Sequence, residues 1–266
     1  NRSVYQKRYD FSFMNPYFSD EGLSLGYNLW WREFDYSSYN VAQYSTNSGA
    51  AQAFLGLPLS EADSVSLMFG IDSNEILAVP GSTPPPLIDY INAVGNRTFK
   101  SWRTQLGWSR DTRNDFFVPV VGSTQSVSAE IALPGSTVEY YKVSFDFAKY
   151  WPLNPALVLR TGLNFGYGDS YGKDFVRNLC YTAPTLPTTG NPNPPPPPAP
   201  TDPCLITSPD YDKTVTATGL PFFENFYAGG IAAQGKVRGF VDNTLGPAYT
   251  SPLGYRQPLG GSFLLA

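Results

Sequence analysis

The sequence contains no histidine and few charged residues: 18 basic and 22 acidic side chains in 266 residues, or 15%. An ordinary soluble domain has about 25%. The lack of histidine excludes a His-based catalytic triad and most His-ligated metal sites. With a net charge of −4 and a pI near 4.9, the chain also has no basic stripe for nucleic acid.

Long apolar runs are missing as well. No window of roughly 18 apolar residues occurs, which excludes a transmembrane helix. Aromatic residues are abundant instead, with 18 Tyr, 18 Phe and 5 Trp, too many for a wholly disordered chain. The chain opens on Asn-Arg-Ser-Val-Tyr without a signal peptide and stops at Ser-Phe-Leu-Leu-Ala, which resembles an interrupted strand. We therefore expect a piece of a longer protein.

Apolar and polar residues alternate with a period of two in eight segments. In the second segment, Leu25, Tyr27 and Leu29 alternate with Gly26 and Asn28. Successive side chains of a strand point to opposite faces, so each segment has one apolar and one polar face. The predicted strands are residues 3–14, 23–34, 48–58, 64–71, 99–110, 125–134, 140–151 and 156–167, and another strand begins at 262–266.

This alternation is compatible with two kinds of all-β protein. In a soluble sandwich or barrel the apolar faces point inward. In an outer-membrane barrel they point toward lipid, and the polar faces line the lumen. Strand length favours the membrane, because soluble strands usually have about five or six residues and membrane-spanning ones roughly 9 to 11. Aromatic pairs near segment ends, at 17–18, 30–31 and 150–151, suit interface girdles.

The connections between the segments differ in length. Residues 15–22, 58–63, 134–139 and 152–155 are short and turn-like, whereas 35–47, 72–99, 110–124 and 168–261 are long. Short turns on one rim and long loops on the other are typical of outer-membrane barrels. We expect polar residues of the strands (Arg8, Arg32, Arg103, Glu130, Asp146 and Arg160) to be structural parts of a polar wall.

Two cysteines, Cys180 and Cys204, bracket a proline-rich run within residues 180–204. The run must be extended or irregular, and we interpret it as a loop spacer, with a ligand for a proline-binding partner as the alternative. An even cysteine pair around a long loop predicts one disulfide. Two free thiols, or a metal site completed by other residues, are the alternatives, although two ligands alone do not make a closed zinc site.

The last third of the chain carries a specific resemblance. The run Gly-Leu-Pro-Phe-Phe-Glu-Asn-Phe-Tyr-Ala-Gly-Gly at 219–230 precedes Val-Arg-Gly-Phe at 237–240 and Asp-Asn-Thr-Leu-Gly-Pro at 242–247. This arrangement resembles the BamA family of barrel-assembly factors, and Asn-Pro-Tyr-Phe at 15–18, Leu-Pro-Gly-Ser at 133–136 and Gly-Tyr-Gly-Asp at 166–169 agree in order. The resemblance spans the chain except 72–97 and the proline-rich insertion. Val-Arg-Gly-Phe alone is weak, because it also marks two-partner secretion transporters.

The resemblance implies a fold and a set of functional residues. It implies an all-β, antiparallel transmembrane β-barrel of outer-membrane type, here a partial barrel of about eight complete strands within one domain, 1–266. Residues 168–261 would form a long extracellular loop directed into the lumen. The family's POTRA domains and its first and last barrel strands, which form its lateral gate, would be absent. The motif residues would be Val237, Arg238, Gly239 and Phe240, supported by Phe226, Tyr227, Gly229, Gly230, Asn243, Gly246 and Pro247.

The expected roles of the motif follow from side-chain chemistry. Arg238 needs a carboxylate partner in a narrow lumen, which the family supplies from later strands. Gly239 would allow close approach of the backbone to the wall, and Phe240 would anchor an apolar contact.

The implied function is assembly and insertion of β-barrel proteins in the outer membrane of a Gram-negative bacterium. Its partners would be unfolded outer-membrane proteins, membrane lipid and lipopolysaccharide, and BAM lipoproteins that bind mostly through POTRA domains. A two-partner secretion pore is the first alternative, and a passive porin or soluble β-sandwich adhesin is the second.

We predict that Arg238→Ala in the full-length protein lowers the level of folded outer-membrane proteins, because the loop tip loses its ion pair. The amount of the variant itself in the membrane should stay normal. Immunoblots of folded porins and of the variant check both expectations, and normal porin assembly would rule out a functional loop.

Overall fold

The computed structural model describes residues 6–35, 44–78, 83–180, 212–230, 237, 239–251 and 254–266. The chain divides into two compact units. The first comprises Asn1–Pro84, Arg97–Lys173 and Gly219–Ala266, and the second comprises Pro85–Asn96 and Asp174–Thr218. Two of the connections between strands supply the second unit, and the single domain expected from the sequence stays a prediction.

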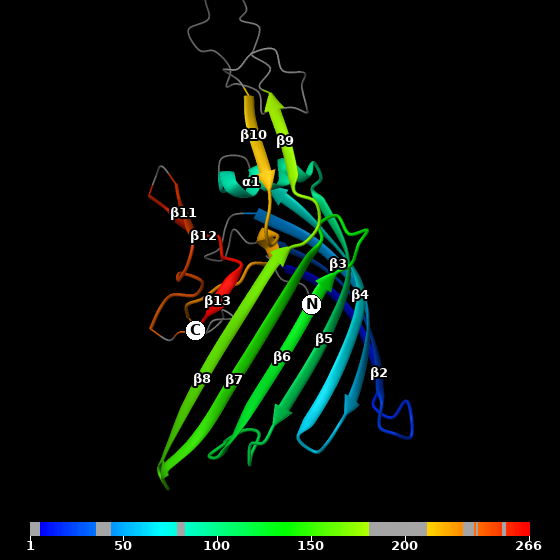
Figure 1. Cartoon of the computed structure of the whole chain (residues 1–266), viewed down its shortest axis with the longest axis vertical. Helices are drawn as coiled ribbons and strands as arrows, with labels where there is room; N and C mark the ends of the chain where they lie inside the picture. The colour runs from blue at the N-terminus through cyan, green and yellow to red at the C-terminus, as the bar shows by residue number, and fades with distance from the viewer. Residues whose placement is uncertain are drawn as a thin grey trace, which may run out of the picture. The chain divides into compact units, whose positions relative to one another are not determined.

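Within the described part of the first unit, nine strands form one antiparallel sheet in the order β1-β2-β3-β4-β5-β6-β7-β8-β13 (Figure 1). The strands are β1 (Gln6–Asn15), β2 (Ser24–Asp35), β3 (Tyr44–Pro58), β4 (Asp63–Ala78), β5 (Thr98–Asp111), β6 (Gly122–Ala132), β7 (Tyr140–Asn154), β8 (Leu157–Ser170) and β13 (Phe263–Leu265). Each of the eight predicted strands overlaps one of β1–β8. β4 extends furthest beyond its prediction, which ended at residue 71.

The strand register gathers apolar side chains on one face of the sheet. Leu25 pairs with Leu55, Leu55 with Leu67, and Leu67 with Leu106, so that one apolar row crosses four strands. Large apolar side chains of this face are exposed, including Tyr9, Phe11, Tyr27, Leu29, Phe69, Trp102 and Leu163. A soluble barrel would bury such a row, whereas lipid solvates it. We call this the outer face.

The opposite, inner face carries the polar side chains. Thr46, Ser48, Asp72 and Ser101 are buried there, although soluble folds usually bury apolar residues and expose polar ones. The apolar-out, polar-in arrangement is that of an outer-membrane barrel wall.

Lys7 breaks the alternation because it lies on the outer face. The register places it opposite Glu33, and its ammonium lies 2.9 Å from the Glu33 carboxylate. In the same row Asn47 donates a hydrogen bond to Glu75 at 3.2 Å. This row of polar side chains thus marks one boundary of the apolar band on the outer face. The paired rings of Tyr9 and Trp31 lie next to it. Aromatic rings beside charges mark a membrane–water interface.

The prediction of one rim of short turns and one of long loops is wrong for two connections. Neighbouring strands are antiparallel, so successive connections alternate between the two edges of the sheet. Residues 16–23, 59–62, 112–121 and 155–156 share one edge, which we call the short-turn edge. Residues 112–121, predicted among the long loops, therefore lie with the short turns, and the turn 133–139 lies at the opposite, long-loop edge. The prediction assigned each connection to an edge by its length, whereas the direction of the preceding strand determines at which edge of the sheet the connection lies.

The second unit contains α1 (Pro85–Val94) and an antiparallel pair, β9 (Phe175–Cys180) and β10 (Asp212–Ala217). The helix contacts both strands, and its buried Leu87, Tyr90 and Ile91 account for its apolar side. Among the described residues, no helix is long and apolar enough to cross a membrane. The disulfide remains a prediction because Cys204, like the proline-rich run, lies outside the described residues.

We expect Leu106→Arg to destabilise the full-length barrel by about 2–4 kcal/mol if Leu106 lies near the bilayer midplane, because a guanidinium on the outer face must enter lipid. Gln105→Arg, one residue away but on the inner face beside Glu130, is the matched control and should cost far less. Urea unfolding in lipid vesicles measures both. Equal destabilisation would contradict the assignment of the faces.

Candidate functional site

After the second unit the chain returns to the first, and the part around the 3₁₀ helix η3 (Phe222–Glu224) packs on the inner face of the sheet. We call residues 219–261 the inward segment. It begins where the Gly219 N–H donates to Ser170 Oγ at 3.1 Å, and it continues into η3. The Phe223 ring lies 5.0 Å from that of Phe99 on β5. The described part of the segment also contains the hairpin β11 (Ala248–Thr250) and β12 (Arg256–Pro258), and the wall strand β13 follows it.

Two glycines of β8 make room for the inward segment. A Cβ on Gly166 would lie 2.5 Å from the Phe226 ring, and one on Gly168 would lie 3.0 Å from Leu220. Any side chain at Gly166 would therefore displace Phe226. Phe226 and Leu220 are buried in one apolar cluster with Ala132, Tyr140 and Leu264. The cluster holds the start of the segment against the wall.

Arg103 of β5 ties the wall strands to the inward segment. Its Nε lies 2.6 Å from Asp72 Oδ1 of β4, without the alignment of a hydrogen bond. Its Nη1 donates to Glu130 Oε1 of β6 at 3.2 Å and to Glu224 Oε1 of the segment at 3.3 Å. One planar guanidinium thus joins three carboxylates from three parts of the chain.

Lys142 and Tyr140 of β7 complete this ion cluster. The Lys142 ammonium lies 3.4 Å from Glu224 Oε2, donates to the Glu224 carbonyl at 3.0 Å and lies 4.8 Å from the centre of the Phe226 ring. The Tyr140 hydroxyl donates to Glu130 Oε1 at 2.9 Å. The Asp72 side chain is only 4% exposed, so removal of any partner would leave a poorly solvated charge.

The two adjacent glycines of the inward segment have positive φ angles, +105° at Gly229 and +75° at Gly230. A Cβ on Gly230 would overlap the Asp242 carboxylate, and one on Gly229 would lie 3.0 Å from the Val241 carbonyl. The backbone here therefore needs glycine for both its conformation and its close packing. Asn243 N–H donates to the Gly229 carbonyl at 3.2 Å and has the left-handed φ of +63° that asparagine tolerates.

The other predicted supporting residues also make their contacts within the inward segment. The Tyr227 ring lies against Gly260. The Gly246 carbonyl accepts a hydrogen bond from Arg256 at 3.3 Å, and the Pro247 carbonyl accepts one from the Leu259 N–H at 3.0 Å. Most of the predicted supporting residues thus take part in hydrogen bonds or close contacts within the described part of the segment.

The family model for the Omp85 superfamily domain matches residues 1–265, essentially the whole chain. This chain belongs to the Omp85 superfamily. It is 28% identical over 261 residues to outer membrane protein assembly factor BamA of Neisseria meningitidis serogroup B, covering 94% of this chain and 27% of that protein. The crystal structure of BamA from Haemophilus ducreyi lacking POTRA domains 1–3 matches with a TM-score of 0.72 and 22% identity. That match covers 99% of this chain and 44% of the other.

These comparisons confirm the predicted resemblance, fold class and location. The chain is part of an Omp85 barrel wall in a Gram-negative outer membrane, and the sheet is unclosed, as a partial barrel requires. The chain spans about a quarter of the length of the Neisseria relative. The soluble adhesin alternative is wrong, because an Omp85 wall exposes its apolar face to lipid.

The Omp85 motif at 237–240 lies only partly within the described residues. Val237 forms an antiparallel bridge with Gly230, and Arg238 lies outside the described residues. The roles expected for Gly239 and Phe240 stay predictions. Among the described residues, no atom lies within 4 Å of a Cβ built on Gly239, whose φ is +89°, and Phe240 is 52% exposed. A backbone conformation with positive φ favours glycine.

Of the predicted wall residues, Arg103 and Glu130 meet in the ion cluster. Elsewhere Arg8 pairs with Asp10 at 2.9 Å, and the guanidinium of Arg32 lies over the Trp30 ring. Asp72 and Glu224, both essential to the cluster, were not predicted. Asp72 could have been predicted by extending the alternation of the fourth segment one residue beyond residue 71. Nothing local marks Glu224, whose partners Lys142 and Arg103 lie 82 and 121 residues away in sequence.

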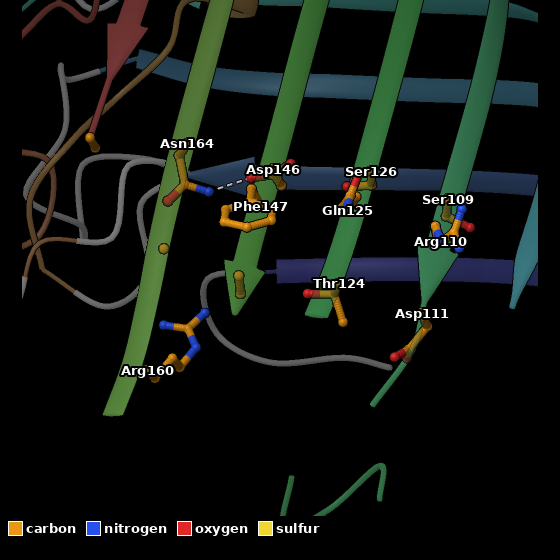
Figure 2. Close-up of a pocket in the computed structure, with 13 residues that line it drawn as sticks. Ser109, Arg110, Asp111, Thr124, Gln125, Ser126, Asp146, Phe147, Arg160 and Asn164 are labelled. Atoms are coloured by element: carbon orange, nitrogen blue, oxygen red, sulfur yellow. Dashed lines mark hydrogen bonds between the residues drawn. The ribbon is translucent and has the colours of Figure 1, made fainter. Parts of the chain in front are cut away.

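A polar hollow of about 640 Å³ lies toward the short-turn edge of the wall (Figure 2). Its side chains include Ser126, Asp146, Arg160 and Asn164, and the Asn164 amide donates to the Asp146 carboxylate (Figure 2). Small polar groups of this kind hydrate a lumen wall. In the described part of the chain, no three Cys, Asp or Glu side chains are arranged to hold a metal ion.

We predict that Glu224→Ala releases the inward segment. The variant loses the contacts with Arg103 and Lys142, which should cost on the order of 2 kcal/mol of docking free energy. Limited proteolysis of the full-length protein in vesicles should then cleave the segment roughly 30-fold faster.

The control is Glu33→Ala, which removes an exposed ion pair of the outer face. It should leave the cleavage rate unchanged. Equal rates in Glu224→Ala and the unsubstituted protein would show that the cluster does not hold the segment.

Proposed function

We propose that this chain is the central wall of a barrel-assembly factor that inserts β-barrel proteins into the outer membrane. The observation that carries this proposal is the anchoring of the inward segment at Glu224, where one carboxylate binds both Arg103 and Lys142. The Neisseria and Haemophilus proteins that match the chain are both BamA, and the Neisseria protein is named as an outer membrane protein assembly factor.

The proposed work is physical and not enzymatic. Exposed sheet edges pair readily with added strands, and hydrogen-bond satisfaction in lipid drives a new barrel to close. Such a process needs no nucleotide, cofactor or covalent intermediate. The residues of this chain would hold the lumen open and place the inward segment within it. Strand pairing itself would occur at a seam formed by other parts of the full-length protein.

The proposed partners follow from the same function. Unfolded outer-membrane proteins would be the substrates, and membrane lipid and lipopolysaccharide would contact the outer face. Lipoproteins of the assembly complex would bind mostly through POTRA domains. No nucleic acid is expected, because the chain has no basic stripe.

A two-partner secretion pore is the alternative function. One observation favours it: the hollow drawn in Figure 2 is lined mostly by polar and charged residues, which suit the path of an extended polypeptide. The two functions differ in what is lost when the inner wall is damaged. An assembly factor would lose folded membrane proteins, whereas a secretion pore would lose one exported protein.

We expect Arg103→Met in the full-length protein, as the only copy in the cell, to lower the level of several folded outer-membrane proteins. The substitution keeps most of the side-chain volume but leaves Asp72, Glu130 and Glu224 without their shared cation. Heat-modifiable mobility of porins on gels measures the folded fraction. The amount and the heat-modifiable mobility of the variant itself serve as controls for its own folding.

Arg110→Met is the matched control, because the one ion pair of Arg110 among the described residues is a long, 3.9 Å contact with Asp63. It should assemble porins normally. Normal porin levels in Arg103→Met, with the variant folded, would contradict the proposal. Normal porins together with loss of one exported protein would favour the secretion pore.

A further inference from the structure

The β5–β6 turn (residues 112–121) uses its polar groups to brace itself. The Asn114 side-chain carbonyl accepts hydrogen bonds from the N–H groups of Val120 and Val121, both at 3.0 Å. Asp115 Oδ1 accepts from the N–H groups of Phe117 at 2.7 Å and Val118 at 2.9 Å. These backbone donors hold the pKa of Asp115 below its usual range, so the carboxylate stays an acceptor. The turn is therefore internally satisfied and rigid.

The cation of the turn is neutralised locally. Arg113 Nη2 lies 2.6 Å from Asp111 Oδ2, and its Nε donates to Asp111 Oδ1 at 2.9 Å. The guanidinium also lies 5.0 Å from the centre of the Phe116 ring. Arg113 thus needs neither water nor an external anion, and burial of the turn in an apolar medium would not leave it unpaired.

The apolar residues of the turn point away from this polar interior. Phe116 is 72% exposed, Phe117 is 88% exposed and Val118 is 72% exposed, and Val120 and Val121 are exposed as well. The two phenylalanine rings contact each other edge to face, 5.3 Å apart. A rigid turn with a polar interior and an apolar surface is unfavourable in water, so an apolar phase or partner should cover it.

The other turns of the short-turn edge identify that phase. Large apolar side chains are exposed in or beside each of them: Tyr17, Phe18, Leu59, Leu153 and Leu157. In the described turn at 133–139 of the long-loop edge, no large apolar side chain is exposed in this way. A single bound protein would cover part of an edge, whereas a bilayer extends along all of it.

A second sign of the bilayer lies on the neighbouring strand. Lys149 and Trp151 lie on the outer face of β7 near the short-turn edge, and the Lys149 ammonium lies 3.8 Å from the centre of the Trp151 ring. A tryptophan beside a lysine whose charged end can reach water is typical of the headgroup region. The outer face beside the turn is therefore at interface depth, and the apolar turn continues a surface that already contacts lipid.

We propose that the β5–β6 turn is a membrane wedge, which places Phe116, Phe117 and Val118 in the headgroup–acyl boundary of the leaflet at the short-turn edge. Its partner is the acyl layer of the bilayer. The wedge fixes the depth of this part of the wall and does not depend on the proposed assembly activity.

The test is spin-label accessibility in the full-length protein, reconstituted in phosphatidylethanolamine–phosphatidylglycerol vesicles. A nitroxide at Phe117→Cys should be relaxed by oxygen, which concentrates in lipid. Relaxation by a water-soluble nickel chelate should be several-fold weaker than at Lys173→Cys, an exposed site at the long-loop edge. Leu106→Cys on the outer face supplies the lipid reference. Labelling of the unsubstituted protein gives the background from Cys180 and Cys204.

Each outcome is decisive. Oxygen access with nickel exclusion at Phe117→Cys supports the wedge. Strong relaxation by the nickel chelate places the turn in water and overturns it. Exclusion of both reagents overturns it too, since the turn is then covered by protein. If Phe117→Cys does not insert, Val118→Cys, whose wild-type side chain is 72% exposed, is measured in its place.

Discussion

The guanidinium of Arg103 is the point on which the rest of this structure depends. Each strand of the wall is held to its neighbours by ladder hydrogen bonds, but these do not place the inward segment. Arg103 does so, because its rigid fork satisfies carboxylates of β4, β6 and η3 together. Desolvation of several charges is costly, so the cluster contributes position more than stability. Close packing of Phe226 against Gly166 completes the attachment of the segment to the wall.

The wall was largely predictable from the sequence, because lipid on one side and a polar lumen on the other impose a period of two. The alternation places Leu25, Tyr27 and Leu29 on one face of a strand, and the observed strand register confirms this placement. The top of β4 was missed because polar residues such as Asn74 and Glu75 occur on both faces there. The two connections at 112–121 and 133–139 were assigned to the wrong edge, because the prediction used their length and did not count the strands before them. Helix α1 and the β9–β10 pair gave no clear local pattern.

The candidate site was predictable only where a residue lay within an alternating strand. Arg103 and Glu130 stood out as charges on a polar face. Glu224 did not, because its significance arises from the folding of the inward segment onto strands far away in sequence. The residues around the Gly229–Gly230 pair came from family resemblance and not from physical reasoning. The contacts expected of Gly239 and Phe240 with the wall stay predictions, because the described residues include only part of a barrel.

The hydrogen bond between Gly219 and Ser170 has a consequence for how this protein can change. The bond joins the two residues of the first unit that flank residues 171–218. The two ends of this stretch of sequence are therefore held next to each other. We expect insertions or deletions between these ends to alter neither the strand register of β8 nor the packing of Phe226 on Gly166. The proline-rich run lies in this part of the sequence. We therefore expect changes of length in this run to leave the packing of Phe226 on Gly166 and the ion cluster around Arg103 unchanged.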